Sequence, residues 1–499
     1  MEKKKLGYSS QLALVASLIA GSVGTGNIWR FPRVAAANGG GTFIIAWAIM
    51  CIVICLPIMM GEHVMGRTSR HGTPGAFRDF VGEKFAWMGA VVAIIMACVA
   101  AYYSAVVAWV AYYLGLSVTK GYYGVDKVAK FNSVSNGNIV TLCLFVMVLA
   151  VSAYIAYTGV KGIEKANKIF LPVLLGCLLV AAIRSITLPG AGKGLEYLFH
   201  FELKELLNYK LWLEALTQAV WSAGPGWGLV ITLAVFSRAK SDVSLTTTIQ
   251  VFGDASVSLI AGMAVIPAIF ALAPTITEAI AITKSGNNGL TFISMTNLFE
   301  HMPGGYIVSI MFFVSLLFAA ISSNICHFMI VSLPFVDSGF DRKKSIMKIF
   351  LLLLIWGAPS AWNANFLSNQ DWVAGQMMLV GALFSCFAIR KFGAKKVREK
   401  FLNTKYTAMN IGSWWEISIK IFAPLVVLLM FVWWSYQSIA WEANWWNPFG
   451  ISNLGTFFMQ GGLMILVSII FNDKISNSVK HKYFNGEEYP EVPDNGYSD

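Results

Sequence analysis

Two long apolar segments are each interrupted near the centre by small and polar residues, and these interruptions could do chemistry. Positions 20–27 read Ala-Gly-Ser-Val-Gly-Thr-Gly-Asn, and positions 222–228 read Ser-Ala-Gly-Pro-Gly-Trp-Gly. Pro225 has no backbone N–H and clashes with the preceding helical turn. Unwound backbone at membrane depth is tolerated only where it lines a cavity or is buried in protein. The freed carbonyls can hold a cation there, and half-helix N-termini can hold an anion. A kinked packing helix would explain one such interruption more easily than two.

A carboxylate and a pair of hydroxyls stand out in the remaining apolar stretches. Asp254 lies within the segment 243–273, where an ionisable residue is a functional-site hypothesis by default. Ser322 and Ser323 share a helical face with Ala319, although serines in membrane helices usually bond back to their own backbone. No motif such as His-Glu-x-x-His accompanies Asp254 or His327. The sequence therefore indicates a binding site and not an enzyme.

The elements that position these residues are membrane helices. The chain is 57% hydrophobic and 13% charged, whereas a soluble domain has roughly 25% charged residues. A helix needs about 20 apolar residues to cross the hydrocarbon core. Reading for such runs predicts twelve spans, near 11–37, 41–66, 87–115, 138–156, 167–185, 211–237, 243–273, 304–336, 345–361, 371–391, 416–436 and 452–472.

The basic residues predict the orientation of these spans. Most of the 37 Lys and Arg residues fall on the side of the termini, which places both termini in the cytoplasm by the positive-inside rule. The net charge of +11 is therefore topological, and no nucleic-acid partner is expected. The seven cysteines lie in apolar stretches without metal-type spacing, as expected of packing residues.

The two interrupted spans divide the chain into repeats. Each is the first helix of a five-helix block, 11–185 and 211–391, and an odd number of helices inverts the second block. Helices 11 and 12 occupy 416–472, after the repeats. A cytoplasmic segment at 1–10, which would contain the inner gate, precedes the first repeat. The polar tail 473–499 is predicted to be disordered because of its composition. The expected fold is an all-α membrane protein with an inverted repeat.

Several motifs resemble one known family. Gly24-Thr-Gly-Asn-Ile-Trp-Arg-Phe-Pro32 and Asn38-Gly-Gly-Gly41 resemble the first-helix signature of the neurotransmitter:sodium symporters. The similarity continues in order through Gly61-Glu62, Tyr102-Tyr103, the segment 162–167, the second interruption and Asp371-Trp-Val-Ala-Gly375. It implies a sodium-coupled importer of an amino acid or similar organic acid in the plasma membrane, working by alternating access without an organic cofactor.

The resemblance implies two sodium sites built from oxygen ligands. The first would comprise the Ser22 carbonyl, Asn27, Ser222 and Asp254. The second would comprise three backbone carbonyls and two hydroxyls, from Ala20, Val23, Ala319, Ser322 and Ser323.

Asp254 also bears on chloride. Chloride-dependent animal members have a neutral Asn at this position, and Trp47, Gln218, Ser222 and Ser258 match the family's chloride pocket. We expect Asp254 to supply the fixed negative charge, so that chloride is not required. The alternative is that Asp254 carries a proton in the opposite direction.

Gly24 bears on the substrate, because monoamine carriers of the family have an Asp there. Gly24 leaves room for a substrate carboxylate, and small residues in the second interruption favour a bulky, aromatic or indole-type side chain. His327 is either a ligand for a distal polar group or a packing residue. The full set implied for the substrate is Ser22, Gly24, Gly26, Val99, Tyr103, Val106, Trp221, Ser222, Gly224, Trp227, Asn324 and His327.

Two gates complete the expected machinery. The outer gate would use Arg30 and Asp371, with Trp221 as an aromatic lid. The inner gate would use Lys5, Tyr8 and Asp337, and Lys5 cannot form the bidentate pair that the more usual Arg makes. Two other readings stay open: a membrane sensor that binds substrate without transport, and a carrier of small neutral amino acids.

Overall fold

Apolar runs in this sequence form helices because a backbone in lipid must satisfy its own hydrogen bonds. The computed structural model describes residues 7–284, 286–486, 488–495 and 497, and in this part of the chain every regular element is helical. Polar caps start several helices. Ser10 accepts a bond from Ala13 N–H at the first helix, and Asp242 accepts one from Leu245 N–H at the helix that carries Asp254.

The first block contains five spans. Its elements are α1 (Gln11–Ser22), η1 (Gly26–Arg30), α2 (Phe31–Ala37), α3 (Gly41–Met50), η2 (Cys51–Cys55), α4 (Leu56–Ser69), α5 (Thr73–Val81), η3 (Glu83–Phe85), α6 (Ala86–Thr119), α7 (Lys127–Ser135), α8 (Ile139–Tyr157) and α9 (Gly159–Ile186). The first span is bent by 58° between α1 and the η1–α2 half.

The second block follows α10 (Ala191–Phe199) and η4 (Leu203–Leu207). Its elements are α11 (Tyr209–Ala223), α12 (Leu229–Ala234), α13 (Val243–Leu272), α14 (Ile276–Thr283), α15 (Gly286–Asn288), η5 (Gly289–Ser294), α16 (Met295–His301), α17 (Gly305–Asp337), α18 (Arg342–Trp362) and α19 (Ala364–Phe392). The remaining elements are α20 (Ala394–Lys396), η6 (Val397–Leu402), α21 (Trp414–Ile417), η7 (Ser418–Phe422), α22 (Ala423–Trp441), α23 (Leu454–Ile470) and α24 (Asn472–Ser478).

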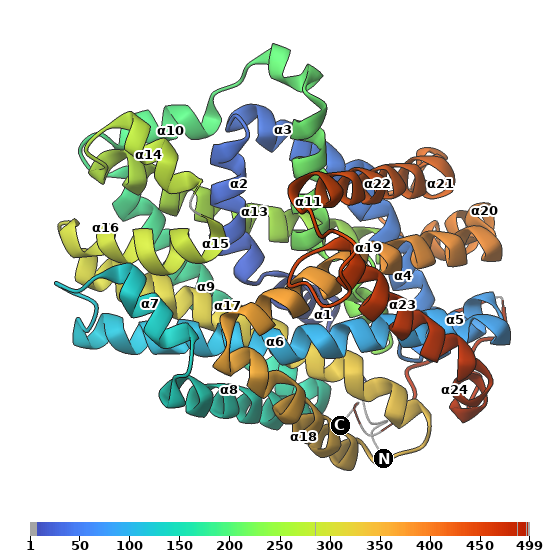
Figure 1. The fold of residues 1–499 in the computed structure, drawn as a ribbon. Coiled ribbons are helices and arrows are strands. Elements are labelled where there is room, and N and C mark those ends of the chain that lie inside the picture. The colour runs from blue at the N-terminus through green and yellow to red at the C-terminus, as the bar shows by residue number, and fades with distance from the viewer. Residues whose placement is uncertain (1–6, 285, 487, 496, 498–499) are drawn as a thin grey trace.

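The helix lengths fit the predicted number of spans. Among the described residues, nine helices are long and apolar enough to cross a membrane, or eleven if the two bent pairs α1–α2 and α23–α24 each count as one span. The remaining predicted span, 211–237, is divided into α11 and α12 by the break at 224–228. The long helices run across the view in Figure 1, roughly parallel to one another.

The packing repeats between the two blocks. The half-helix α1 packs on α13 of the second block, and its counterpart α11, the first half of the second interrupted span, packs on α3 of the first block. The longest helices, α6 and α17, pack on each other and on α8 and α18. The first two spans of each block thus form an inner bundle, and the third and fourth spans of each block form a surrounding scaffold. This is the arrangement of a five-plus-five inverted repeat.

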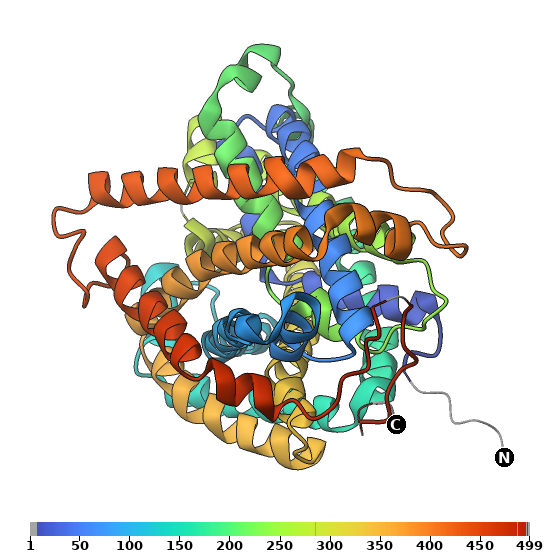
Figure 2. The same cartoon turned by 90° about the vertical axis from the view of Figure 1, so that its right-hand side faces the viewer.

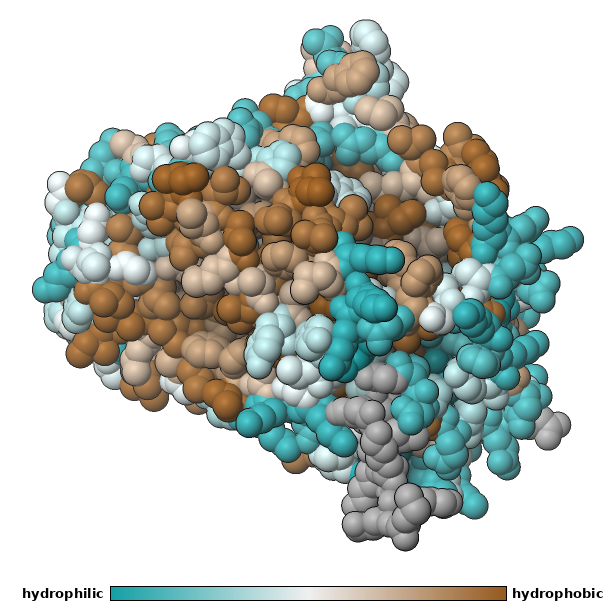
Figure 3. All heavy atoms as spheres, turned by 90° about the horizontal axis from the view of Figure 1, so that it is seen from below, coloured by the Kyte–Doolittle hydropathy of each residue, from teal (hydrophilic) through white to brown (hydrophobic). Residues whose placement is uncertain are grey.

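The surface has the pattern of a membrane protein. Figure 3 shows a broad apolar area over the middle of one face, with hydrophilic residues gathered at its right-hand end. Exposed apolar side chains on the spans include Met147, Ile183, Ile355 and Leu466. We call the end of the bundle that carries α5, α20 and α24 the tail end, and the opposite end the vestibule end (Figure 1).

The prediction of a disordered tail is wrong for the part that the structure describes. α24 covers Asn472–Ser478, and the chain beyond it lies against the tail end, with Val492 and Tyr497 buried. Polar composition suggested disorder. The tail is held instead by its backbone carbonyls, which accept bonds from arginines of the bundle and leave no pattern in the sequence.

Candidate functional site

The first interruption is stabilised by a side chain of its own segment. α1 ends at Ser22, and Val23 N–H still reaches the Ile19 carbonyl at 2.7 Å. The chain then leaves the helix until η1 begins at Gly26. Asn27 Oδ1 accepts a bond from Gly24 N–H at 2.9 Å, which satisfies a donor that the broken helix leaves free. The carbonyls of this turn have lost their helical partners and are available to a ligand.

The second interruption depends on glycines and on a buried carboxylate. Gly224, Gly226 and Gly228 have φ angles of 81°, 83° and 75°, a left-handed conformation that side chains disfavour. Glu62 Oε1 accepts bonds from Gly226 N–H at 2.8 Å and from Ser385 Oγ at 2.7 Å. Glu62, which belongs to the Gly61-Glu62 motif of the resemblance, therefore caps the unwound backbone.

The two interruptions meet at a buried polar cluster around Asp254. Asn27 Nδ2 donates to Ser222 Oγ at 2.8 Å, to Asp254 Oδ1 at 2.8 Å and to Ser258 Oγ at 2.9 Å. Ser222 Oγ donates to Asp254 Oδ2 at 2.5 Å. All four side chains are at most 1% exposed. The structure thus brings together Asn27, Ser222 and Asp254 from three elements; Ser222 and Asp254 contribute oxygens to the cluster, and Asn27 turns its amide nitrogen towards them.

A second group of oxygens lies where α17 passes the end of α1. Ser322 Oγ donates to the carbonyls of Ala20 at 2.7 Å and Ala319 at 2.8 Å. Ser323 Oγ donates to the carbonyl of Val23 at 3.0 Å. The hydroxyls therefore bond across to the broken helix as well as back to their own. Two hydroxyls and three carbonyls in one place suit a small hard cation.

A cavity of about 360 Å³ lies between these groups and the vestibule end. A Cβ at Gly24 would lie 2.9 Å from Tyr103 Oη and 3.2 Å from Ser323 Oγ, so a larger residue would enter this space. Tyr103 Oη accepts a bond from Thr25 N–H at 3.2 Å. Of the predicted substrate residues, the cavity wall contains Ser22, Gly24, Gly26, Val99, Tyr103, Val106, Trp221, Trp227 and His327.

Three predicted substrate residues do not line this cavity. Asn324 is buried elsewhere, because its Nδ2 donates to Ser104 and Ser152, both at 3.1 Å. Gly224 faces the ring of Trp227, to which a Cβ would come within 3.2 Å. Ser222 is occupied in the Asp254 cluster. Asn324 therefore contacts the scaffold and not the cavity, whereas His327 lines the cavity, and its Nδ1 has no hydrogen-bond partner among the described residues.

The residues that match the family's chloride pocket do not all lie together. Ser258 belongs to the Asp254 cluster. Gln218 turns towards the vestibule, where its Oε1 accepts a bond from Arg30 Nη1 at 2.5 Å. Trp47 packs against Phe31 with ring centroids 4.7 Å apart, and its indole N–H has no hydrogen-bond partner in the part of the chain that the structure describes.

The comparisons with known proteins agree with this geometry. The model of the family described as "Sodium:neurotransmitter symporter family" matches residues 5–124 and 121–477. The chain belongs to this family. An uncharacterized sodium-dependent transporter of Methanocaldococcus jannaschii is 28% identical over 84% of this chain and 88% of that protein. The sodium-dependent neutral amino acid transporter B(0)AT2 of Pongo abelii is 25% identical over 60% of this chain and 45% of its own length.

A solved structure has the same fold. The crystal structure of MhsT in complex with L-phenylalanine covers 86% of this chain and 99% of its own, with a TM-score of 0.73 and 24% sequence identity. This symporter-family protein is therefore a multi-pass, sodium-dependent membrane transporter with discontinuous first and sixth spans, and it is not an enzyme.

The two charged residues predicted for the outer gate line the cavity without contacting each other. Arg30 and Asp371 both line it, but no ion pair joins them among the described residues. Trp221 packs against α19 so closely that a Cβ at Gly375 would lie 2.3 Å from its ring. Trp221 thus lines the same cavity as Arg30 and Asp371, and its role as a lid stays a prediction.

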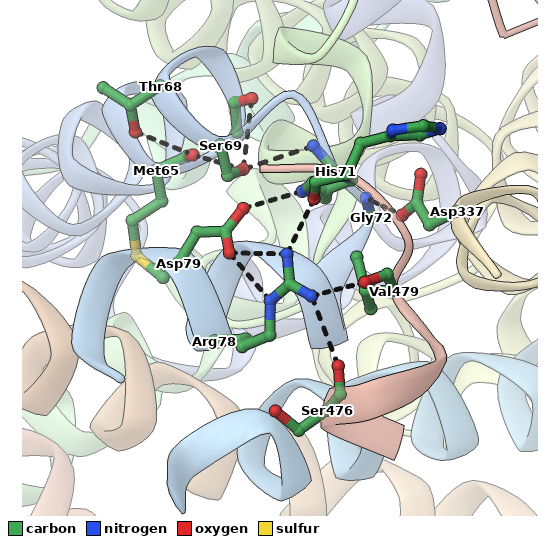
Figure 4. A network of polar contacts seen from close by, with 12 residues as sticks. Met65, Thr68, Ser69, His71, Gly72, Arg78, Asp79, Asp337, Ser476 and Val479 are labelled. Carbon is green, nitrogen blue, oxygen red and sulfur yellow. Dashed lines mark hydrogen bonds and ion pairs between the residues drawn. The ribbon is translucent and has the colours of Figure 1, made fainter. Parts of the chain in front are cut away.

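Two of the three predicted inner-gate residues, Tyr8 and Asp337, lie in the described part of the chain, and both contact neighbouring backbone. Lys5 lies outside the described residues. Tyr8 is 1% exposed, and its N–H donates to the Phe236 carbonyl at 3.2 Å. Asp337 Oδ2 accepts a bond from Gly72 N–H at 2.7 Å, as Figure 4 shows. Asp337 is thus tied to the turn between α4 and α5.

Part of the cavity wall was missed by the sequence reading. Gly286, Asn288 and Gly289 line it from α15 and the start of η5, and Leu367, Ser368 and Met378 line it from α19. The polar, glycine-rich run 286–289 is a signal that could have been used, because it interrupts an otherwise apolar connection. Met378 carries no such signal, because a methionine on a membrane helix reads as ordinary packing.

Proposed function

We propose that this symporter imports a large neutral amino acid together with sodium, and that it does so without chloride. The observation that carries the proposal is the position of Asp254. Its carboxylate lies at the meeting point of both interrupted spans, bonded to Asn27 and Ser222. A buried carboxylate needs a compensating charge, and a sodium ion among these oxygens would supply it.

The ion chemistry follows from the two oxygen groups. The first sodium would bind at Ser22, Asn27, Ser222 and Asp254, and the second would bind at the carbonyls and hydroxyls around Ser322 and Ser323. Because Asp254 provides a fixed negative charge, no chloride is needed to balance the first sodium. A protonated Asp254 on the return step would instead produce proton counter-transport, which the experiment below distinguishes.

The substrate class follows from the cavity. Gly24 leaves space beside Tyr103 for a carboxylate, and the wall farther on is formed by Val99, Val106, Trp227 and other apolar side chains. A volume of about 360 Å³ accepts an aromatic amino acid. The MhsT title names L-phenylalanine, and the B(0)AT2 name specifies neutral amino acids; both support the amino-acid class.

In the proposed mechanism, the two ends of the bundle open alternately. With the termini in the cytoplasm of the cell, sodium and substrate enter from the vestibule end. Shared ligands make their affinities reciprocally dependent. Closure of Arg30 and Asp371 over Trp221 would then precede opening of the tail end. The membrane potential assists, because moving one charge through 100 mV releases about 2.3 kcal/mol.

Uptake by purified protein in liposomes tests the proposal. Labelled phenylalanine, tryptophan, leucine and alanine are supplied with external sodium or choline, each with and without chloride, and internal pH is followed with a dye. We expect uptake of the larger substrates only with sodium, unaffected by chloride. A chloride requirement contradicts the role of Asp254, and alkalinisation coupled to uptake supports proton exchange at that residue. Preference for alanine favours a carrier of small substrates, and sodium-dependent binding without uptake favours a sensor.

A further inference from the structure

The C-terminal tail crosses the face through which substrate would leave. The family match ends at residue 477, so the chain beyond it is not part of the shared architecture. Figure 2 looks onto the tail end, and the dark-red chain runs from α24 across it towards the N-terminal helix. Three groups of contacts hold this segment in place.

The first contact is made by Arg78 of α5. Its Nη1 donates to the carbonyls of Ser476 at 3.2 Å and Val479 at 2.6 Å, and its Nη2 donates to the carbonyl of His481 at 2.8 Å. Asp79, whose side chain is 1% exposed, orients Arg78 and also accepts a bond from His71 (Figure 4). The start of the tail is therefore fixed through its backbone.

The second contact is made by the arginines at the end of α4. Arg70 donates to the Pro490 carbonyl through Nε at 3.0 Å and Nη2 at 2.6 Å. The guanidinium of Arg67 lies 3.9 Å from the ring centroid of Tyr489. Burial raises the pKa of Tyr489 to about 12, so the phenol keeps its proton and donates to the Phe401 carbonyl at 2.9 Å.

The third contact is Tyr497, which is 0% exposed. Its carbonyl accepts a bond from Val160 N–H of α9 at 2.9 Å, and its hydroxyl bonds Ser332 of α17. Its ring packs on Phe236, just after α12, at 5.8 Å and lies 5.3 Å from the guanidinium of Arg342 of α18. Burial raises the pKa of this tyrosine as well, so it stays neutral.

These contacts join the inner bundle to the scaffold, which must separate when the tail end opens. α1 and α12 belong to the inner bundle, whereas α17 and α18 belong to the scaffold. Phe236 follows α12 and accepts a bond from Tyr8 N–H ahead of α1, and a Cβ at Gly7 would lie 3.4 Å from Val492 of the tail. Tyr497 joins Phe236, at the end of α12, to α17 and α18, so the tail end cannot open between α12 and the scaffold while this bridge is in place.

We infer that the C-terminal tail is an intramolecular inhibitor, which locks the inner gate shut by inserting Tyr497 between the inner bundle and the scaffold. Release of the tail sets how often the transporter opens inward. The inference rests on alternating access and not on the identity of the substrate.

A native cysteine reports the opening. Cys326 of α17 is 0% exposed, and a Cβ at Gly21 of α1 would lie 2.9 Å from its sulfur. Gly21 precedes Ser22 on the side of the tail end, so separation of α1 from α17 would expose the thiol there. The experiment uses full-length protein in inside-out vesicles with Cys143→Ser and Cys177→Ser. An impermeant maleimide is added, and labelling of the Cys326 peptide is followed by mass spectrometry without substrate.

We expect Tyr497→Ala to label Cys326 about fivefold faster, because a buried hydrogen bond and its ring packing are lost. Tyr497→Phe, which keeps the ring, should fall between it and the parent, and Glu488→Ala, which alters an exposed tail side chain, should match the parent. A chain ending after Lys482 should label fastest, and a peptide of residues 483–499 added to it should slow labelling again.

Equal labelling rates in the parent, Tyr497→Ala and the truncated chain would overturn the inference, as would a peptide without effect. Failure of amino-acid uptake would leave these rates unchanged, so the two proposals can fail separately.

Discussion

The two ends of this transporter are closed to different degrees and by different means. At the vestibule end, Arg30 and Asp371 line one cavity, and Asp371 is exposed. At the tail end, Tyr8 and Tyr497 are buried, and two arginines, Arg70 and Arg78, hold the tail through its carbonyls. In the proposed orientation, with the tail end in the cytoplasm, the structure corresponds to an outward-facing state. The difference indicates that outer closure depends on two side chains, whereas inner closure depends on many contacts that must be released together.

The largest expected effect lies where the two ends meet. Asp254→Asn removes the only carboxylate of the polar cluster formed by Asn27, Ser222, Asp254 and Ser258. Loss of one partner of a buried ionic interaction costs about 3 kcal/mol or more, so sodium affinity should fall about 100-fold in chloride-free buffer. Sodium-dependent binding of labelled phenylalanine measures this.

Chloride addition separates a lost charge from a misfolded site. It should restore much of the binding in Asp254→Asn, because an anion can replace the missing carboxylate, and the exposed substitution Glu278→Gln should bind normally. An Asp254→Asn variant that binds sodium as tightly as the parent in the absence of chloride would contradict the need for a negative charge at this site.

A smaller effect is expected at the lid of the vestibule end. In Gly375→Ala the new Cβ would lie 2.3 Å from the ring of Trp221, so the lid must move. Overpacking costs about 1–3 kcal/mol, and we expect substrate affinity to fall about tenfold. Gly176→Ala, which meets no atom within 4 Å, is the matched control. Unchanged affinity in Gly375→Ala would mean that Trp221 is not part of outer closure.

The tail end should show the opposite response. Asp79→Asn weakens the orientation of Arg78 and the bond to His71, and thus loosens the attachment of the tail. Cys326 labelling from that side should rise about threefold while outward substrate binding changes little, since one hydrogen bond to a charged group contributes about 1.5 kcal/mol or more. Glu83→Gln, at an exposed position in the same region, is the control. A fall in substrate affinity without faster labelling would contradict the separation of the two ends.

The smallest effect concerns the ion pair between Lys127 and Glu300, whose atoms are 2.5 Å apart. The hydrogen bond from Lys127 holds the pKa of Glu300 below its ordinary value. The pair therefore stabilises the fold above the usual titration range of a carboxyl and loses its effect as the pH falls through the lowered pKa. Glu300→Gln should lower the melting temperature by only a degree or two at pH 7, since surface pairs contribute about 0–1 kcal/mol. The difference from the parent should vanish in acid. A larger loss of stability, or one that persists in acid, would contradict the reading of this contact as a weak surface ion pair.

The sequence predicted the helices and the two interruptions because both depend on local properties. Apolar length fixes a span, and Pro225 with its neighbouring glycines breaks one. The meeting of Asn27, Ser222 and Asp254 came from the family resemblance, and the structure brings these residues together. Their role as sodium ligands stays a prediction.

The failures of the sequence reading arose where a side chain or segment had a choice of partners. Asn324 sits on the face that suggested a substrate contact, yet Ser104 and Ser152 satisfy its amide within the scaffold. The tail reads as disordered, yet arginines more than 400 residues away hold its carbonyls. Neither partner choice leaves a periodic pattern along the chain, so spacing alone could not reveal it.

Equilibrium binding of phenylalanine at varied sodium concentration tests the central claim most directly. The account predicts that, in chloride-free buffer, sodium tightens phenylalanine binding and phenylalanine tightens sodium binding by the same factor, because both ligands complete one site beside Asp254. Phenylalanine affinity that is independent of sodium would contradict the shared site and, with it, the coupling proposed for this transporter.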